Sequence, residues 1–348
     1  MRVWIDVMTP KQATMFGFIA RYLVERGHEV LFTAREYEST AGAARRLGIE
    51  VHVIGKYAEG EPVDKVVADA EREAGLARLV WGFRPDALLA YPNPPAAKVA
   101  YGLSISYVAM TDSPHAVIPS RLALPLARAA VFSSCIPPDA IMKYLMEGSA
   151  VIQYNGFDEL SWVLRVKPKE SYVKGIGLEP GKYVVIRPHE FMATYYRDVK
   201  ASVDPWELAR FVCEEMGMDV VIIPRYTAHV RRAKSLRKEV GDRVHVLLGH
   251  YDGASLTGHA HAVITGGASM AREAALYGTP AAIYYPRRLY VDECISRHGF
   301  PLFWVRSDEE AREFLARARD LRKNTAALLK GLDDPAEVVA EVLERVVG

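Results

Sequence analysis

The 348-residue sequence lacks several features that mark common classes of protein. Its three cysteines, Cys135, Cys213 and Cys294, lie far apart without a C-x-x-C pair, which argues against a zinc site or a framework of disulfides. No uncharged apolar run reaches roughly 18 residues, the length needed to cross a membrane. The start, Met1 to Asp6, is typical of a strand bearing a carboxylate rather than of a signal peptide. These absences predict a cytoplasmic protein.

Neither sign of charge dominates the chain. Lys and Arg number 44 and Asp and Glu number 43, so the whole-chain field does not attract nucleic acid, and no nucleic-acid partner is expected. Asparagine occurs three times and glutamine twice. Because thermophilic proteins avoid these thermolabile amides, we infer a thermophilic source.

Short apolar segments alternate with helical patterns through the first half of the chain. After a strand from Val3 to Val7, residues Thr9-Pro10-Lys11-Gln12 form a loop, and apolar residues then recur at helical spacing up to Gly27. The same alternation predicts strands at 29–33, 51–54, 87–90, 105–110 and 129–133, with helices at 41–47, 63–81, 94–102 and 120–126. Strands separated by helices need crossover connections, so a parallel sheet is predicted.

The pattern restarts in the second half. Strands are predicted at 183–187, 220–224, 244–248, 262–265 and 281–285, with helices at 205–216, 230–240, 254–258 and 269–278. We therefore predict an N-terminal Rossmann-like domain at 1–160, a linker at 161–182, and a C-terminal Rossmann-like domain at 183–348 that includes closing helices at 309–322 and 336–346. The predicted fold class is α/β, with two Rossmann-like domains facing a cleft.

The strongest functional signal is the segment from Val263 to Pro280. A strand leads into Gly266 and Gly267 and then into a helix, so free backbone N–H groups and the positive helix end meet where phosphate would bind. The glycines let the backbone approach a ligand, and Ser269 can cap the helix and offer a hydroxyl to phosphate. Glu273 can accept two hydrogen bonds from a ribose diol. The alternative is a tight turn followed by a solvated carboxylate.

This order of strand, paired glycines, helix with Glu273 and Gly278-Thr279-Pro280 resembles the donor-nucleotide motif of GT-B glycosyltransferases of the MurG kind and of non-hydrolysing UDP-N-acetylglucosamine 2-epimerases. More closely, nearly the whole chain resembles a largely archaeal family of unknown function that is described as predicted glycosyltransferases. The segments that carry this closer resemblance are Trp4-Ile5-Asp6, Thr9-Pro10-Lys11-Gln12, Arg26-Gly27-His28-Glu29-Val30, Asp112-Ser113-Pro114-His115, Arg121-Leu122-Ala123-Leu124-Pro125-Leu126-Ala127 and Arg187-Pro188-His189-Glu190. The resemblance implies the GT-B architecture.

The resemblance also implies that the second domain binds a nucleoside diphosphate sugar, with UDP as the expected nucleotide. The residues implied to contact the diphosphate are Gly266, Gly267, Ala268 and Ser269, with Glu273 on the ribose and Arg187 on the phosphate or sugar. Arg187 has an independent argument, because a guanidinium at the carboxyl end of a strand pairs bidentately with phosphate. Its alternative is an ion pair with Glu190. Tyr251 or His250 would contact the base, or serve packing only.

Residues on the acceptor side are expected in the first domain. Asp6, Lys11 and Gln12 are the candidates there, and Lys11 either binds an anionic acceptor or is solvated. His115 is the candidate base for the acceptor hydroxyl proton, with Asp112 fixing its tautomer or raising its basicity. The alternative is that Asp112 caps a turn and His115 lines the cleft.

Together these features predict a metal-independent glycosyltransferase. A helix dipole, backbone N–H groups and an arginine can neutralise the departing diphosphate, and no D-x-D motif is present, so no cofactor or metal is expected. The expected partners are a nucleotide sugar and an unidentified acceptor. One class of acceptor considered is a lipid-linked or cell-envelope glycan. The Arg-rich stretch 225–238 suits a solvated helix or a peripheral membrane contact. The alternatives are a UDP-sugar 2-epimerase and a non-catalytic nucleotide-binding or regulatory protein.

Overall fold

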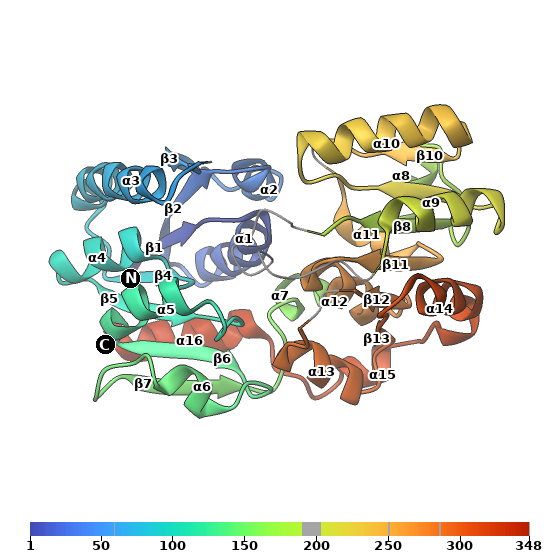
Figure 1. The fold of residues 1–348 in the computed structure, drawn as a ribbon. Coiled ribbons are helices and arrows are strands. Elements are labelled where there is room, and N and C mark those ends of the chain that lie inside the picture. The colour runs from blue at the N-terminus through green and yellow to red at the C-terminus, as the bar shows by residue number, and fades with distance from the viewer. Residues whose placement is uncertain (59, 190–202, 250, 285–286, 348) are drawn as a thin grey trace. The chain divides into compact units, whose positions relative to one another are not determined.

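The computed structural model describes residues 1–58, 60–189, 203–249, 251–284 and 287–347. The chain divides into two compact units, one formed by Met1–Trp162 with Asp333–Gly348 and the other by Val163–Leu332 (Figure 1). Each unit is built around one parallel sheet with helices, which confirms the α/β class predicted from alternating strands and helices. None of the described helices is long and apolar enough to span a bilayer.

The first unit contains seven parallel strands in the order β3-β2-β1-β4-β5-β6-β7. Their bounds are β1 (Arg2–Val7), β2 (Glu29–Glu36), β3 (His52–Lys56), β4 (Ala87–Ala90), β5 (Ser106–Met110), β6 (Ala129–Ser133) and β7 (Ala150–Tyr154). Every residue of the interior strands β4 and β6 is buried, which explains their unbroken apolar sequence. The edge strand β7 was not predicted, because only Tyr154 in it is buried and its apolar run, Ala150-Val151-Ile152, is short.

The helices of the first unit include the last helix of the chain. They are α1 (Pro10–Glu25), α2 (Thr40–Arg45), α3 (Pro62–Phe83), α4 (Pro94–Gly102), α5 (Val117–Ala123), α6 (Pro138–Met142) and α16 (Pro335–Val347), and α7 (Leu160–Val163) lies at the unit boundary. Figure 1 shows α16, drawn in red, among the blue and green elements of this unit.

The place of α16 differs from the sequence-based prediction, which assigned it to the second domain. Its apolar face, with Val339 and Leu343 fully buried, packs against α1 and beside β5 and β6. Glu344 of α16 lies 3.0 Å from a guanidinium nitrogen of Arg26 and 3.1 Å from Nε2 of His28. The helix thus completes the cover of the first sheet.

The second unit contains six parallel strands in the order β10-β9-β8-β11-β12-β13. The strands are β8 (Tyr183–Arg187), β9 (Asp219–Ile222), β10 (Val244–Val246), β11 (Ala262–Thr265), β12 (Ala281–Ile283) and β13 (Leu302–Trp304). The helices are α8 (Glu170–Gly175), α9 (Pro205–Glu214), α10 (Thr227–Val240), α11 (Gly253–Gly258), α12 (Ala268–Leu276), α13 (Tyr290–Arg297), α14 (Asp308–Leu321) and α15 (Ala326–Leu329). The predicted linker 161–182 contains α8, which packs against α11 and buries Val173.

The strand order reverses once in each sheet. The reversal lies between β1 and β4 in the first unit and between β8 and β11 in the second. Neighbouring helices diverge to opposite faces at such a point, and ligands of doubly wound sheets bind there, outside the carboxyl ends of the strands. The residues that follow β1, β4, β8 and β11 are therefore the first place to look for a functional site.

Candidate functional site

Residues 265–268 form a tightly bonded turn at the reversal point of the second sheet. The Thr265 hydroxyl accepts a hydrogen bond from the Gly267 N–H at 3.0 Å and donates to the Gly267 carbonyl at 2.9 Å. The Gly266 N–H donates to the carbonyl of Arg187, the last residue of β8, at 3.0 Å. Helix α12 then begins at Ala268, with Gly267 as its N-cap. The first turn of a nine-residue helix, with its orphan N–H groups, thus starts at the carboxyl edge of β11.

The two glycines of this turn have different surroundings. A Cβ on Gly266 would lie 2.4 Å from the Cβ and 2.5 Å from the Cα of His189, so glycine at 266 is required where the loops after β8 and β11 cross. A Cβ on Gly267 would lie 2.9 Å from Nη2 of Arg225, the end of a flexible side chain. Neither glycine has a positive φ. Lack of space therefore explains the glycine at 266, whereas at 267 a flexible side chain could move aside.

Two arginines lie near this turn. Arg187, at the end of β8, pairs in register with Thr265, and Nη2 of Arg225, which follows β9, lies 2.9 Å from the position that a Cβ on Gly267 would occupy. Burial and the nearby Arg225 lower the pKa of His189, which favours the neutral imidazole. The Arg225 guanidinium beside a helix N-terminus, with Arg187 at the end of the adjacent strand, forms a setting suited to a diphosphate. Sequence reasoning named Arg187 but counted Arg225 only as part of a basic stretch.

Ser269 does not cap α12. The helix begins one residue before the predicted start, so its N-cap is Gly267 and Ser269 is its second residue. The sequence-based capping role is therefore wrong. Ala268 and Ser269 are both partly exposed in the first turn, beside Gly267.

Glu273 lies one turn further along α12 and faces the start of α11. A Cβ on Gly253, the first residue of α11, would lie 3.5 Å from Oε2 of Glu273. Burial, together with the carboxylates of Glu273 and Asp252, raises the pKa of Tyr277. Partly exposed Tyr251 directly precedes Asp252, the N-cap of α11. The structure thus brings Glu273 close to the loop that bears Tyr251, whereas His250 and Glu190 lie outside the described residues.

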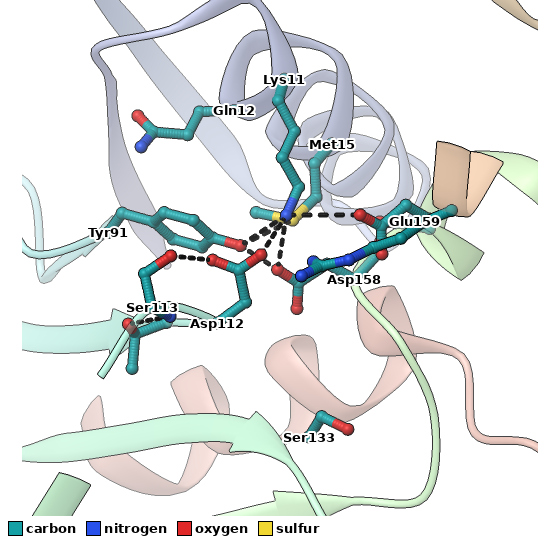
Figure 2. A network of polar contacts seen from close by, with 12 residues as sticks. Lys11, Gln12, Met15, Tyr91, Asp112, Ser113, Ser133, Asp158 and Glu159 are labelled. Atoms are coloured by element: carbon teal, nitrogen blue, oxygen red, sulfur yellow. Dashed lines mark hydrogen bonds and ion pairs between the residues drawn. The ribbon is translucent and has the colours of Figure 1, made fainter. Parts of the chain in front are cut away.

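In the first unit, Lys11 lies at the centre of a cluster of acidic side chains (Figure 2). Its Nζ atom lies 2.6 Å from Asp112, 3.2 Å from Asp158 and 3.5 Å from Glu159. The hydroxyl groups of Tyr91 and Tyr154 both donate to Asp158. We call these six residues the Lys11 cluster.

The side chains of the Lys11 cluster are largely buried. The Lys11 side chain is 16% exposed, and the side chains of Asp158 and Glu159 are 2% and 0% exposed. Burial and the adjacent carboxylates hold the pKa of Tyr91 and of Tyr154 well above the ordinary tyrosine value, so both remain protonated donors. Buried charges are tolerated when they are paired, as Asp158 and Glu159 are with Lys11. The ammonium group of Lys11 is therefore directed at carboxylates of its own chain.

Lys11 and Gln12 do not lie in a loop, as the sequence predicted. They belong to the first turn of α1, which begins at Pro10 with the Thr9 hydroxyl accepting from the Gln12 N–H at 3.4 Å. The Gln12 carboxamide oxygen accepts from the Met8 N–H at 2.8 Å. This reciprocal pair resembles a capping box, which explains why Thr9-Pro10-Lys11-Gln12 opens a helix. Figure 2 shows Gln12 turned away from the carboxylates that Lys11 meets.

Asp6 belongs to a buried ion pair rather than to an accessible surface. It is 0% exposed, and its oxygens lie 2.7 and 3.0 Å from two guanidinium nitrogens of Arg72. Thr33 and Asn93 donate further hydrogen bonds to it. The expectation of an acceptor-side role for Asp6 therefore conflicts with its burial in the structure.

His115 and Asp112 occupy the segment between β5 and α5. His115 is partly exposed, and its carbonyl accepts from the Val117 N–H at 3.0 Å. The Asp112 carboxylate accepts from the Ser113 hydroxyl at 2.7 Å in addition to its contact with Lys11. The structure thus joins two predicted residues, Asp112 and Lys11, in one network.

Two groups of residues at these edges escaped the sequence analysis. Asp158 and Glu159 follow β7, and because that edge strand was not recognised, they were not sought as residues after a strand. Arg225 follows the strand predicted at 220–224, a position that should have drawn attention to it. Within the described part of the chain, no group of three or more acidic, histidine or cysteine side chains is arranged to hold a metal ion.

Comparison with known proteins relates the whole chain to one family and to one architecture. A family model described as "Protein of unknown function (DUF354)" matches residues 1–346. The uncharacterized protein MJ0665 of Methanocaldococcus jannaschii is 25% identical over 297 residues, which cover 82% of this chain and 82% of the relative.

Similar solved structures include an epimerase and a glycosyltransferase-like protein. The UDP-GlcNAc 2-epimerase of Methanocaldococcus jannaschii, in complex with UDP-GlcNAc and UDP, has a TM-score of 0.69 at 11% identity and covers 99% of this chain and 100% of its own. UGT73P12 of Glycyrrhiza uralensis, complexed with glycyrrhetinic acid 3-O-monoglucuronide, has a TM-score of 0.61 at 11% identity. The match covers 99% of this chain and 95% of the UGT73P12 chain. These similarities show the GT-B fold with its two Rossmann-like domains. With nearly every residue matched by its family model, the chain belongs to the DUF354 family.

Proposed function

We propose that this protein transfers a sugar from a nucleoside diphosphate sugar, with UDP as the expected nucleotide, to an acceptor hydroxyl without a metal ion. The observation that carries the proposal is the meeting of Arg187, Arg225 and the turn at Gly266 and Gly267 with the start of α12. Two arginines and a helix N-terminus near one point favour the charge that develops on a departing diphosphate.

The proposed reaction makes one bond and breaks one. The acceptor oxygen attacks the anomeric carbon, the bond from that carbon to the diphosphate oxygen breaks, and the diphosphate leaves with the electron pair. Arg187 and Arg225 neutralise the charge on the leaving group. His115 takes the acceptor hydroxyl proton, a role supported by its partial exposure after β5 and by the ordinary imidazole pKa near about 6.5.

The nucleoside half of the donor is assigned to the start of α11. Glu273 is partly exposed and faces Gly253, where a side chain would otherwise fill the space beside its carboxylate. Such a carboxylate can accept two hydrogen bonds from a ribose diol, and Tyr251 offers a ring for the base. The proposal thus places the diphosphate at the start of α12 and the ribose about one turn further along it.

The test is a calorimetric titration of the protein with UDP, GDP, CDP and ADP. We expect one diphosphate to bind selectively, and Arg187→Ala and Arg225→Ala each to weaken it at least about tenfold, as loss of a hydrogen bond to a charged group does. Arg231→Ala, an exposed arginine on α10, is the matched control and should leave affinity unchanged. Absence of binding by every diphosphate would refute the nucleotide site.

A second candidate is C2 epimerisation of a UDP-sugar. It is favoured by the similarity of the fold to solved UDP-GlcNAc 2-epimerases over nearly the whole chain. An epimerase would convert UDP-GlcNAc alone and exchange the C2 hydrogen with solvent deuterium. A glycosyltransferase would release UDP only when acceptor is present. Tight nucleotide binding with neither reaction would indicate a non-catalytic binding protein.

A further inference from the structure

An arginine that meets no carboxylate of the described residues lies at the carboxyl edge of the first sheet. Arg35 is the next-to-last residue of β2 and is only partly exposed. Its Nε atom is buried without a hydrogen-bond partner, and its hydrogen bond within the described chain runs from Nη2 to the Met8 carbonyl at 3.4 Å. None of the ion pairs found among the described residues involves it.

Two tyrosine rings hold the Arg35 guanidinium in place. Its central carbon lies 5.4 Å from the ring centre of Tyr37 and 4.9 Å from that of Tyr57, and the two ring centres are 4.9 Å apart. Both tyrosines are partly exposed, one after β2 and one after β3. Aromatic faces attract a cation but do not accept the in-plane N–H groups as a carboxylate does, so the fork of donors remains for a ligand.

The surroundings of Arg35 disfavour its positive charge when no anion is bound. Burial and the positive charge of Arg72 lower the pKa of Arg35, while Asp69 on α3 partly offsets them from beyond ion-pairing distance. Burial in turn raises the pKa of Asp69. Arg72 offers a contrast, because its own guanidinium meets the Asp6 carboxylate at 2.7 Å. A partly buried cation that lacks such a partner gains most from an anion that comes from outside the chain.

The comparison with Lys11 shows which cation is available to an anionic ligand. Lys11 already meets three carboxylates of its own chain in the Lys11 cluster. Among the described residues, the polar and aromatic partners of the Arg35 guanidinium are a carbonyl and two rings, and Arg35 lies beside Met8, the residue that follows β1 at the reversal of strand order. The anionic-acceptor contact that the sequence suggested for Lys11 is therefore better placed at Arg35.

We propose that Arg35, held by Tyr37 and Tyr57, forms an anion subsite in the first unit that binds the oxyanion group of the acceptor, a phosphate or a carboxylate. The identification of the ligand as the acceptor rests on the proposed function. The subsite itself is a property of the first unit, whereas the nucleotide is assigned to the second, so the two can fail separately.

The test is residue-resolved chemical modification of the full-length protein. Phenylglyoxal modifies arginine side chains, and peptide mass spectrometry gives a separate rate for each of them. The soluble probes are glycerol 3-phosphate and succinate, and the lipid probe is vesicles of phosphatidylglycerol in phosphatidylcholine. UDP is present with every probe. Pure phosphatidylcholine vesicles are the control for the lipid probe. At ten times its dissociation constant, a probe should slow modification of Arg35 about tenfold, by simple occupancy. Exposed Arg46 on the surface near α2 should react at an unchanged rate.

Each outcome bears on one of the two proposals. Protection of Arg35 by the soluble probes supports a soluble oxyanion, and protection only by anionic vesicles supports a lipid headgroup. An unchanged Arg35 rate with every probe would overturn the subsite. The rates at Arg187 and Arg225 with and without UDP report on the nucleotide site in the same samples, so failure there is seen separately.

A second measurement separates a ligand-binding role of Arg35 from a structural one. Without ligand, Arg35→Met keeps the aliphatic stem between the rings and removes the cation, and we expect its unfolding temperature to equal or exceed that of the wild type. Arg72→Met, which breaks the pair with Asp6, should lower that temperature strongly. A similarly strong fall in Arg35→Met would show that Arg35 is a structural cation and would contradict the proposal.

Discussion

The two glycines at the start of α12 should respond differently to the same substitution. In Gly266→Ala the new methyl group would sit 2.4 to 2.8 Å from the Cβ, Cα and N atoms of His189, two of which are backbone and cannot move alone. Overpacking of this kind costs about 1–3 kcal/mol, and contact with backbone places this case near about 3 kcal/mol. Unfolding of the second unit should then occur roughly 6–12 °C lower.

Gly267→Ala should instead affect the ligand. Among the described residues, the atom nearest to its methyl group is Nη2 of the flexible Arg225 side chain, with the Thr265 hydroxyl at an ordinary 3.9 Å, and Gly267 has an extended backbone that alanine adopts freely. We expect the free energy of unfolding to change by no more than about 0.5 kcal/mol. Because the methyl group and the displaced guanidinium occupy the proposed diphosphate position, affinity for UDP should fall at least about tenfold.

Thermal unfolding and calorimetry with UDP on the same preparations provide the assay. Gly175→Ala, at the end of α8 with open space around its Cβ position, is the matched control and should be neutral or slightly stabilising. Equal destabilisation by the two substitutions would refute the packing argument. An unchanged UDP affinity in Gly267→Ala would refute the position of the diphosphate.

Two further predictions concern charge. Lys11→Met should lower the free energy of unfolding by about 3–5 kcal/mol at neutral pH, because three carboxylates lose their shared cation. Urea titration should show a smaller loss in acid, where the carboxylates are protonated. As a control, Lys98→Met removes an exposed ion pair and should change the free energy of unfolding by less than about 1 kcal/mol. Burial lowers the pKa of His229 to about 4 from 6.5, with His189 and Arg225 adding to the shift. The unfolded chain therefore binds the proton more readily, so stability is full above about pH 6.5 and falls as the pH drops toward about 4, by on the order of 3 kcal/mol. His229→Gln should remove that dependence, and an unchanged pH profile would contradict it.

The interior strands of both sheets could be predicted from the sequence because buried strands have a simple pattern of consecutive apolar residues. β4, β6, β8 and β11 have the bounds predicted for them, since strands covered on both faces need nearly continuous apolar residues. Edge strands have no such requirement. β7 has one buried residue, and β13 has three residues with only Leu302 buried, and neither was predicted.

The candidate sites were predictable to the extent that they follow recognised strands. The turn after β11 and Arg187 after β8 were found in this way, and Asp158 and Glu159 were missed along with β7. Pairing could not be predicted at all. The sequence does not show that Lys11 meets three carboxylates, because Asp112, Asp158 and Glu159 lie more than 100 residues away, or that Tyr57 joins the nearby Tyr37 at Arg35.

The return of α16 to the first unit makes the order of synthesis matter. Residues 163–332 form one continuous stretch, so the second unit can fold as soon as Leu332 has been made. The first unit must wait for the helix that bridges Glu344 to Arg26, residues 318 positions apart. Closing so long a loop is entropically unfavourable in an open chain, and a folded second unit shortens the distance to be closed. Until then, the surface of α1 that α16 covers is exposed and open to chaperones or to misassembly.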